Sequence, residues 1–362
     1  MNAATAIPRR PTDLTAAWLS SALGSDGGTV EVDRASVQPV GTGQTGAAYR
    51  ITVTYTTNPN ALPASFVAKL PAQDDEVRDR VSLGYRSECA FYQSVADQVG
   101  IPVPHSFYCA INDDATEFVL LLADQHPAVQ GDQIAGCGEG DARLAVRALA
   151  GLHGPTWRQE KWLSFPDLAM SVFDEAGAKG LGDIAKMSAE FTVDKLGDRL
   201  DDTDRETLLT AMDLVTPWLL TERGCFSLMH GDYRVDNMLF HPDGSRVHVV
   251  DWQTLGVGLP TRDLAYFTAT SLDPAMRGVI EADLVAEYHR TLTTFGVRDY
   301  DLQSCWEDYR FGMLQAPMIS VLGFAFAVGT DRGDDMVTTM IRRGCRAIRD
   351  LDALELISRS GS

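Results

Sequence analysis

The chain has 362 residues, of which 45% are hydrophobic, so it can bury a sizeable core, and its length favours two domains or lobes. Its 50 acidic and 31 basic residues give a formal net charge of -19, which repels phosphate backbones and argues against general binding of nucleic acids or anionic membranes. The six cysteines form no CxxC pair, which argues against a zinc site or a disulfide framework and favours a reducing cytoplasm.

The N-terminal segment predicts a short amphipathic helix rather than a signal peptide. Leu14, Trp18 and Ala22 recur at helical spacing, and Thr12 or Asp13 can cap the helix that contains them. No apolar run of signal-peptide type is present, so we expect this segment to pack on the folded protein.

Residues from about 30 to 122 are mainly strand-like. Apolar residues alternate from Tyr49 to Tyr55, which predicts a half-buried strand. A turn over Asn58–Asn60 leads to a second strand, Ser65–Leu70, so the two are expected to pair as a hairpin. Lys69 is unusual in this otherwise apolar strand. The other elements expected here are a helix with apolar spacing from Val81 to Val99 and strands at Ser106–Ile111 and Glu117–Leu122.

The remainder of the chain is mostly helical in pattern, after a soft boundary near Ala123–Gly131. The expected helical regions are Asp141–His153, about 181–222, Ile280–Phe295, Cys305–Leu314 and Met336–Leu356. One island of short strands interrupts them, at Phe226–Met229, Met238–Phe240 and Val247–Val250. Loops between short strands often carry chemistry, so this island is the first place to look for a site.

The clearest chemical signal is the segment HGDYRVDN, His230–Asn237, which a strand separates from the sequence DWQ that begins at Asp251. Its fixed residue types at fixed spacing form a specific motif. Phosphoryl transfer needs hard oxygen ligands for Mg²⁺, and a strand hairpin would bring Asn237 and Asp251 together to supply them. It also needs a carboxylate that orients or deprotonates the attacking hydroxyl, and Asp232 suits that role. The alternative for Asp232 is a turn carboxylate that caps its own backbone.

These segments resemble the catalytic and metal-binding motifs of the aminoglycoside phosphotransferase and choline kinase superfamily. With FVAKL, YRSECAFY, FVLLLADQ, ALAGLH and LPTRDLAYF, they are most similar to the ecdysteroid kinase-like branch and its bacterial relatives, over about residues 38–275. The resemblance implies an α+β, protein-kinase-like, two-lobed fold. An N-lobe over residues 1–124, with an antiparallel sheet and a helix, would bind nucleotide. A larger, mainly helical C-lobe over residues 125–362 would carry the catalytic loop, the metal site and the acceptor-binding helices.

The upstream residues suit nucleotide binding. Gly41, Gly43 and Gly46 fit GxGxxG between two strands, so their backbone N–H groups could close over the ATP phosphates. Lys69 is costly inside an apolar strand unless an anion neutralises it. We expect the ATP phosphates and Glu88, on the following helix, to be its partners. The pairing with Glu88 is what the resemblance implies, and an ordinary solvated helix carboxylate is the alternative.

Three further assignments come from the resemblance. Leu122 and Asp124 lie in a hinge whose backbone groups would read the adenine edge. Asp263 would brace the catalytic loop through hydrogen bonds, which is a structural role. Arg234, two residues after Asp232, matches the place where protein kinases carry a lysine facing the transferred phosphoryl group, so it would stabilise charge in the transition state. An ordinary exposed arginine is the alternative.

The histidines do not indicate a metal site. His126, His153 and His289 have no second ligand at useful spacing. His153 ends an apolar helix, so we expect a helix cap or a hydrogen-bonded core histidine.

The sequence therefore predicts an enzyme, a kinase that uses ATP and Mg²⁺ to phosphorylate a hydroxyl of a small molecule. The ecdysteroid kinase-like interpretation suggests a hydroxylated, fairly apolar acceptor such as a steroid or another secondary metabolite. An aminoglycoside or aminosugar, which suits the acidic charge balance, and a hydroxyacyl thioester are alternatives. Neither nucleic acid nor a membrane is expected as a partner, and the expected location is the cytoplasm.

Two other classes make different predictions. An ATP-binding pseudokinase should lack at least one of the four residues Lys69, Asp232, Asn237 and Asp251, and all four are present. A protein kinase usually carries an arginine where this chain has Gly231, and that arginine senses a phosphorylated activation loop. The short connection from Asp251 to Asp263 also leaves little room for a segment that docks a protein substrate.

Overall fold

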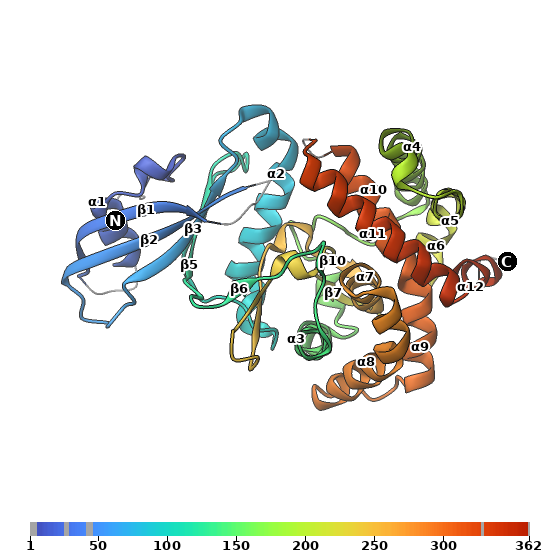
Figure 1. Cartoon of the computed structure of the whole chain (residues 1–362). Coiled ribbons are helices and arrows are strands. Elements are labelled where there is room, and N and C mark those ends of the chain that lie inside the picture. Colours follow the sequence, from blue (N-terminus) through green and yellow to red (C-terminus); the bar gives the residue numbers. More distant parts are fainter. Residues whose placement is uncertain (1–5, 25–28, 41–45, 327–328, 361–362) are drawn as a thin grey trace. The chain divides into compact units, whose positions relative to one another are not determined.

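The computed structural model describes residues 6–24, 29–40, 46–326 and 329–360 (Figure 1). The chain divides into two compact units. The smaller unit contains Met1–Gln98, Val103–Pro127 and Val250–Thr254, and the larger unit contains Val99–Pro102, Ala128–Val249 and Leu255–Ser362. The segment Val250–Thr254 thus belongs to the smaller unit, although its neighbours in the sequence belong to the larger one.

A five-stranded antiparallel sheet, blue to green in Figure 1, forms the centre of the smaller unit. The strand order is β1-β2-β3-β5-β4, and β2 and β3 are neighbours, as the predicted hairpin requires. The strands are β1 (Glu31–Val40), β2 (Gly46–Thr57), β3 (Ser65–Pro71), β4 (Ser106–Ile111) and β5 (Phe118–Ala123).

Helix α1 spans Ala16–Leu23 and begins later than the sequence predicted. Residues Pro11–Asp13 form a separate 3₁₀ turn, which the Asp13 carboxylate closes by accepting hydrogen bonds from the preceding backbone. The hydroxyl of Thr15 accepts a hydrogen bond from the first turn of α1 and caps it. The predicted cap at Thr12 or Asp13 is therefore wrong, because the 3₁₀ turn already uses these residues.

The two faces of the sheet have different neighbours. Successive side chains of a strand point to opposite faces, and Phe66 and Leu70 of β3 are buried in a core with Trp18 of α1. Lys69 therefore lies on the other face, where its register partner on β5 is Leu120. The alternation of β3 thus places one cation on the sheet face opposite α1.

Helix α2 spans Asp75–Ala90 and begins earlier than the predicted start near Val81. It continues as a short π-helix and a 3₁₀ turn up to Gln98. The segment around Trp252 packs against it, and the Trp252 ring stacks on Phe91 with a centroid distance of 3.6 Å and an interplanar angle of 4°. At Gly84, an added Cβ would lie 3.0 Å from the Cβ of Gln253, so a glycine is needed for this approach. These contacts join the DWQ segment to the smaller unit.

The larger unit is mainly helical, and two of its helices were not predicted. Neither α7 nor α10 has a solvent-exposed polar face, and every residue of α7 is buried. The predicted region 181–222 is divided into three helices, α4, α5 and α6. The helices are α3 (Glu139–Thr156), α4 (Glu175–Leu196), α5 (Asp202–Asp213), α6 (Val215–Leu220), α7 (Thr261–Ser271), α8 (Pro274–Thr294), α9 (Leu302–Phe311), α10 (Gln315–Phe326), α11 (Asp331–Asp350) and α12 (Ala353–Ser360).

Short strands carry the predicted motif loops of the larger unit. The hairpin of β8 and β9 confirms the predicted strands on either side of the Pro242–Ser245 turn, and Met238 pairs with Val249 at its open end. The strands are β6 (Val129–Gln130), β7 (Ser227–Met229), β8 (Met238–Phe240), β9 (Val247–Val249) and β10 (Gly256–Gly258). Among the described residues, no helix combines the length and the apolar character needed to cross a membrane.

Candidate active site

Lys69 lies in a cluster of charged side chains within the smaller unit. Its Nζ is 2.6 Å from Oε2 of Glu88 on α2 and 2.7 Å from Oδ1 of Asp251. The Lys69 and Glu88 side chains are 16% and 1% exposed, so each charge depends on its partner. The expected ion pair between Lys69 and Glu88 is present, and Asp251 is an additional partner that the sequence did not indicate.

Burial and charge act in opposite directions on this cluster. Burial alone would lower the pKa of Lys69, but the carboxylates of Asp251 and Glu88 outweigh it and raise that pKa above its ordinary value. Burial raises the pKa of Glu88, and the nearby Lys69 cation opposes this effect. Lys69 is therefore a firmly protonated cation, which suits contact with phosphate oxygens.

Asp251 has a backbone conformation that is rare for a residue with a side chain. Its φ is +67°, in the left-handed region that favours glycine. Aspartate is one of the few other residues that enter this region routinely, and strained residues gather at functional sites. The turn just after β9 thus places Asp251 Oδ1 within hydrogen-bond distance of Lys69.

In the larger unit, the loop that begins at His230 is held from behind by helix α7. Asp263 is fully buried, and its carboxylate accepts hydrogen bonds from the backbone N–H groups of His230 (2.7 Å) and Gly231 (2.9 Å). Gly231 has a φ of +82°, and its carbonyl oxygen accepts a hydrogen bond from Gln315. The predicted bracing role of Asp263 is confirmed.

His153 supports this brace and is a satisfied core histidine, as predicted. Its Nε2 is 3.3 Å from the Asp263 carboxylate and its Nδ1 is 2.7 Å from the Tyr288 hydroxyl. Burial lowers the pKa of His153, although the Asp263 carboxylate opposes this. A neutral ring can donate from Nε2 to Asp263 and accept at Nδ1 from Tyr288.

Asp232 stands in front of this brace and is contacted by three side chains. The Tyr266 hydroxyl donates to Oδ1 at 2.7 Å, the Asn237 amide donates to Oδ2 at 2.9 Å, and the Arg234 Nε is 3.0 Å from Oδ1. The Asp232 side chain remains 21% exposed. The alternative in which Asp232 caps only its own turn does not describe this arrangement, because its carboxylate is also bound by Tyr266 of helix α7.

Arg234 bridges two carboxylates. It contacts Asp232 and also Asp236, whose Oδ2 is 3.3 Å from Nη1. Burial alone would lower the pKa of Arg234, but Asp232 and Asp236 help to raise it above its ordinary value. Arg234 is only 18% exposed, so it is not the ordinary exposed arginine that we considered as the alternative. Its role toward a phosphoryl group stays a prediction.

Asn237 is oriented so that its side-chain oxygen can serve as a ligand. Its amide nitrogen donates both to Oδ2 and to the backbone oxygen of Asp232, at 2.9 and 2.8 Å. Within the part of the chain that the structure describes, its Oδ1 receives no hydrogen bond. The oxygens of Asn237 and Asp251 are hard donors of the kind that Mg²⁺ prefers, so both residues fit the predicted metal role.

Of the other predicted nucleotide-binding residues, Gly46 and Leu122 lie on the sheet. Gly41 and Gly43 are outside the described residues, and Gly46 is the first residue of β2. Leu122 on β5 pairs with Val67, two residues before Lys69, so it lies on the same face of the sheet as Lys69.

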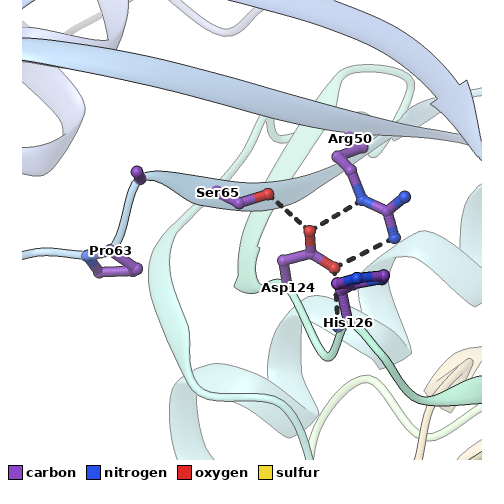
Figure 2. Close-up of a pocket in the computed structure, with 6 residues that line it drawn as sticks. Arg50, Pro63, Ser65, Asp124 and His126 are labelled. Carbon is purple, nitrogen blue, oxygen red and sulfur yellow. Dashed lines mark hydrogen bonds and ion pairs between the residues drawn. The ribbon is translucent and has the colours of Figure 1, made fainter.

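Asp124 forms a second polar cluster of the smaller unit, in a hollow of about 460 Å³ (Figure 2). Figure 2 shows its carboxylate directed at Arg50 of β2 and Ser65 of β3. It accepts hydrogen bonds from Arg50 Nε (2.8 Å), from the Ser65 hydroxyl (2.5 Å) and from the backbone N–H of His126 (3.1 Å). This carboxylate therefore ties the segment after β5 to two strands, which leaves only its backbone for the predicted contact with adenine.

Replacing Asp124 by Asn should destabilise the chain by about 2 kcal/mol, because hydrogen bonds to a buried carboxylate are lost. Burial would raise the pKa of Asp124, but its partners Ser65 and Arg50 lower it below its ordinary value. The charged form thus adds stability at neutral pH, and this contribution is lost as the pH falls toward the lowered pKa. Urea unfolding between pH 7 and pH 3 should show a smaller loss of stability for Asp124→Asn than for the wild type. An equal loss would contradict this assignment.

Comparison with known proteins adds a family assignment to this geometry. A family model described as the ecdysteroid kinase-like family matches residues 41–296. The chain belongs to this family. The matched region includes Lys69, Glu88, Asp232, Asn237 and Asp251, and it ends later than the range of about 38–275 estimated from the motifs.

The curated relatives of this family member are much longer proteins. The chain is 26% identical over 210 residues to acyl-CoA dehydrogenase family member 11 of Gallus gallus, which covers 55% of the chain and 25% of that protein. It is 26% identical over 181 residues to acyl-CoA dehydrogenase family member 10 of Mus musculus. This match covers 42% of the chain and 17% of that protein. The chain thus spans a quarter or less of the length of these relatives.

Solved structures share the fold at low identity. A putative aminoglycoside phosphotransferase from Ralstonia eutropha JMP134 has a TM-score of 0.55 and 16% identity, and covers 92% of the chain and 97% of its own. A microcompartment-associated aminopropanol kinase has a TM-score of 0.55 and 14% identity, and the match covers 93% of the chain and 98% of the kinase. A GDP complex of an aminoglycoside 2'-phosphotransferase-IIIa variant has a TM-score of 0.50 and 15% identity, and the match covers 95% of the chain and 97% of that enzyme. The predicted kinase-like α+β fold is confirmed.

Proposed function

We propose that the protein is an ATP- and Mg²⁺-dependent O-phosphotransferase that phosphorylates a hydroxyl of a small molecule. The observation that carries this proposal is the partly exposed Asp232 carboxylate on a braced loop, with Asn237 bonded to it. The ecdysteroid kinase-like family model supports the class of reaction. The GDP in a structural relative supports nucleotide binding. A division of roles, in which residues 1–124 bind nucleotide and residues 125–362 bind the acceptor, is part of the proposal.

The residues take distinct roles in this proposal. Asp232 orients the acceptor hydroxyl and receives its proton as the new O–P bond forms. The bond between the γ-phosphorus and the bridging oxygen breaks, and ADP leaves with its electron pair. Lys69, held by Glu88, binds nucleotide phosphates, and Arg234 stabilises charge on the transferred group. Asn237 and Asp251 would hold Mg²⁺, which when bound supplies positive charge to the phosphate oxygens.

For the nucleotide base, we propose that the backbone around Leu122 and Asp124 reads the adenine edge. The apolar side chains of Val67 and Leu122 on the Lys69 face of the sheet would contact the ring. Gly41, Gly43 and Gly46 would close over the phosphates.

The acceptor has two leading classes. The ecdysteroid kinase-like family model supports a hydroxylated steroid or a similar secondary metabolite. A hydroxyacyl thioester is the second candidate, because the curated relatives that contain a matching region are named as acyl-CoA dehydrogenase family members. An aminoglycoside or aminosugar is also consistent with the acidic charge balance.

The direct test is ADP release from Mg·ATP in the presence of sterols, hydroxyacyl thioesters, aminoglycosides and macrolides. One class should raise ADP release well above the rate without acceptor, and mass spectrometry should find the phosphorylated product. Chelation of Mg²⁺ with EDTA should abolish this release, and added Mg²⁺ should restore it, because the hard oxygen ligands suit that ion. Unchanged release in EDTA would contradict the metal assignment. ATP binding without release by any acceptor class would favour a nucleotide-binding pseudokinase.

A further inference from the structure

Tyr266 received no role from the sequence, yet it makes the shortest of the three side-chain contacts to Asp232. Its hydroxyl donates to Oδ1 at 2.7 Å. The side chain is 1% exposed, and burial, together with the Asp232 carboxylate, raises the pKa of Tyr266 well above its ordinary value. The phenol therefore stays protonated over the pH range of most enzymes and can act only through the hydrogen bond that it donates.

Helix α7 contacts the motif loop at two points. Asp263 and Tyr266 are three residues apart, which places them on the same side of the helix. Asp263 accepts from the backbone of His230 and Gly231, whereas Tyr266 donates to the side chain of Asp232. One fully buried helix thus fixes both the path of the loop and the direction of its carboxylate.

The three partners occupy different sides of the Asp232 carboxylate. Tyr266 binds Oδ1 and Asn237 binds Oδ2, whereas Arg234 Nε is 3.0 Å from Oδ1 and 3.1 Å from Oδ2. A donor nearly equidistant from both oxygens lies across the edge between them. A carboxylate has about four acceptor positions, and the hydrogen bonds from these three partners use three of them. An acceptor hydroxyl that approaches along the edge between the two oxygens must therefore displace Arg234.

The partners differ in how firmly they are anchored. Tyr266 belongs to a buried helix, and Asn237 is also bonded to the Asp232 backbone oxygen at 2.8 Å. Arg234 has a long side chain whose other contacts are Asp236 and the Met336 sulfur, both at 3.3 Å. Arg234 is consequently the partner most easily displaced.

We propose that Tyr266 is a positioning residue for the phosphotransfer. Together with Asn237 it holds Asp232 so that the edge between the two carboxylate oxygens, which Arg234 spans, is the edge that receives the acceptor hydroxyl. Arg234 leaves this edge when the acceptor binds and turns to the phosphoryl group. This inference rests on the proposed function, and it defines where the hydroxyl must lie relative to helix α7.

The test compares Tyr266→Phe with Tyr233→Phe. Tyr233 is also buried, and its hydroxyl donates to the Ala145 carbonyl oxygen at 2.8 Å, so both variants lose one buried hydrogen bond of similar length. Crystal structures of both variants should show the Asp232 carboxylate displaced only in Tyr266→Phe. With the acceptor found above, the kcat of Tyr266→Phe should fall about 10- to 100-fold, because misplaced reacting groups cost this much. Its KM for ATP should stay within about twofold of the wild type.

The two readouts separate two kinds of failure. An Asp232 carboxylate that keeps its position in Tyr266→Phe, or an equal loss of kcat in both variants, would overturn the positioning role. If no acceptor raises ADP release in the wild type, the proposed function fails, and the crystal structures still decide whether Tyr266 holds Asp232.

Discussion

Asp232→Asn should lower acceptor-dependent ADP release by about 10²- to 10⁴-fold, the range expected for loss of a general base or orienting carboxylate. The amide has nearly the same shape but cannot take the proton of the acceptor hydroxyl. ATP affinity should be unchanged, because the proposed nucleotide contacts are made by other residues. Steady-state kinetics together with calorimetric measurement of ATP binding checks both parts.

The matched control for this variant is Asp236→Asn. Asp236 lies four residues further along the same loop and contacts the same Arg234, but it does not contact Asp232 in the described structure. It should therefore lose much less activity. If the two variants lose activity equally, the effect comes from the counter-charge of Arg234, and Asp232 is not the group that receives the proton.

Lys69→Met should remove activity and also destabilise the fold by about 3–5 kcal/mol, the range for breaking one side of a buried ion pair. The variant leaves Glu88 buried without its cation, at 1% exposure. Burial already raises the pKa of Glu88 in the wild type, whereas Lys69 lowers it. Removal of Lys69 should therefore raise the pKa of Glu88 further. A buried carboxyl group with a raised pKa destabilises the folded state when it is charged. This cost decreases as the pH falls, because the group becomes protonated. Urea unfolding should therefore show that Lys69→Met loses more stability relative to the wild type at pH 8 than at pH 5.

The double variant Lys69→Met/Glu88→Gln separates stability from catalysis. It removes the uncompensated charge, so most of the lost stability should return, while ADP release should stay absent because no cation binds the phosphates. Recovery of activity in the double variant would contradict the role of Lys69. A double variant as unstable as Lys69→Met would show that Glu88 is not the source of the destabilisation.

The sequence predicted the parts of the fold that show a clear period. Alternation identified β2 and β3, and it made Lys69 conspicuous because a cation inside an apolar strand requires a partner. Glu88 and Asp263 were then placed by the family resemblance, and their contacts are present in the structure. The catalytic and binding roles of these residues stay predictions.

Buried helices could not be predicted in the same way. The polar residues of α7 are spread around the helix and α10 has almost none, so neither sequence shows the single polar face that marks a surface helix. Tyr266 was missed for this reason, because a tyrosine among apolar neighbours has the pattern of an ordinary core residue. One available signal was its spacing of three residues from Asp263, which places both side chains on one side of a helix.

Contacts between charged groups were equally hard to predict. The sequence assigned Arg234 to a phosphoryl group, and its pairing with both Asp232 and Asp236 depends on local loop geometry that has no periodic pattern. The contact of Asp251 with Lys69 joins residues 182 positions apart, so only the folded chain reveals it.

The left-handed backbone at Asp251 affects how its chemistry can be probed. An alanine there would lose the carboxylate and also meet steric strain at a φ of +67°, so alanine scanning would mix two effects at this position. Asparagine tolerates that conformation, which makes Asp251→Asn a test of charge alone. Glycine would remove the ligand without this strain, so the difference between the alanine and glycine variants isolates the backbone contribution. In related sequences, the same geometry should restrict this position to aspartate, asparagine and glycine.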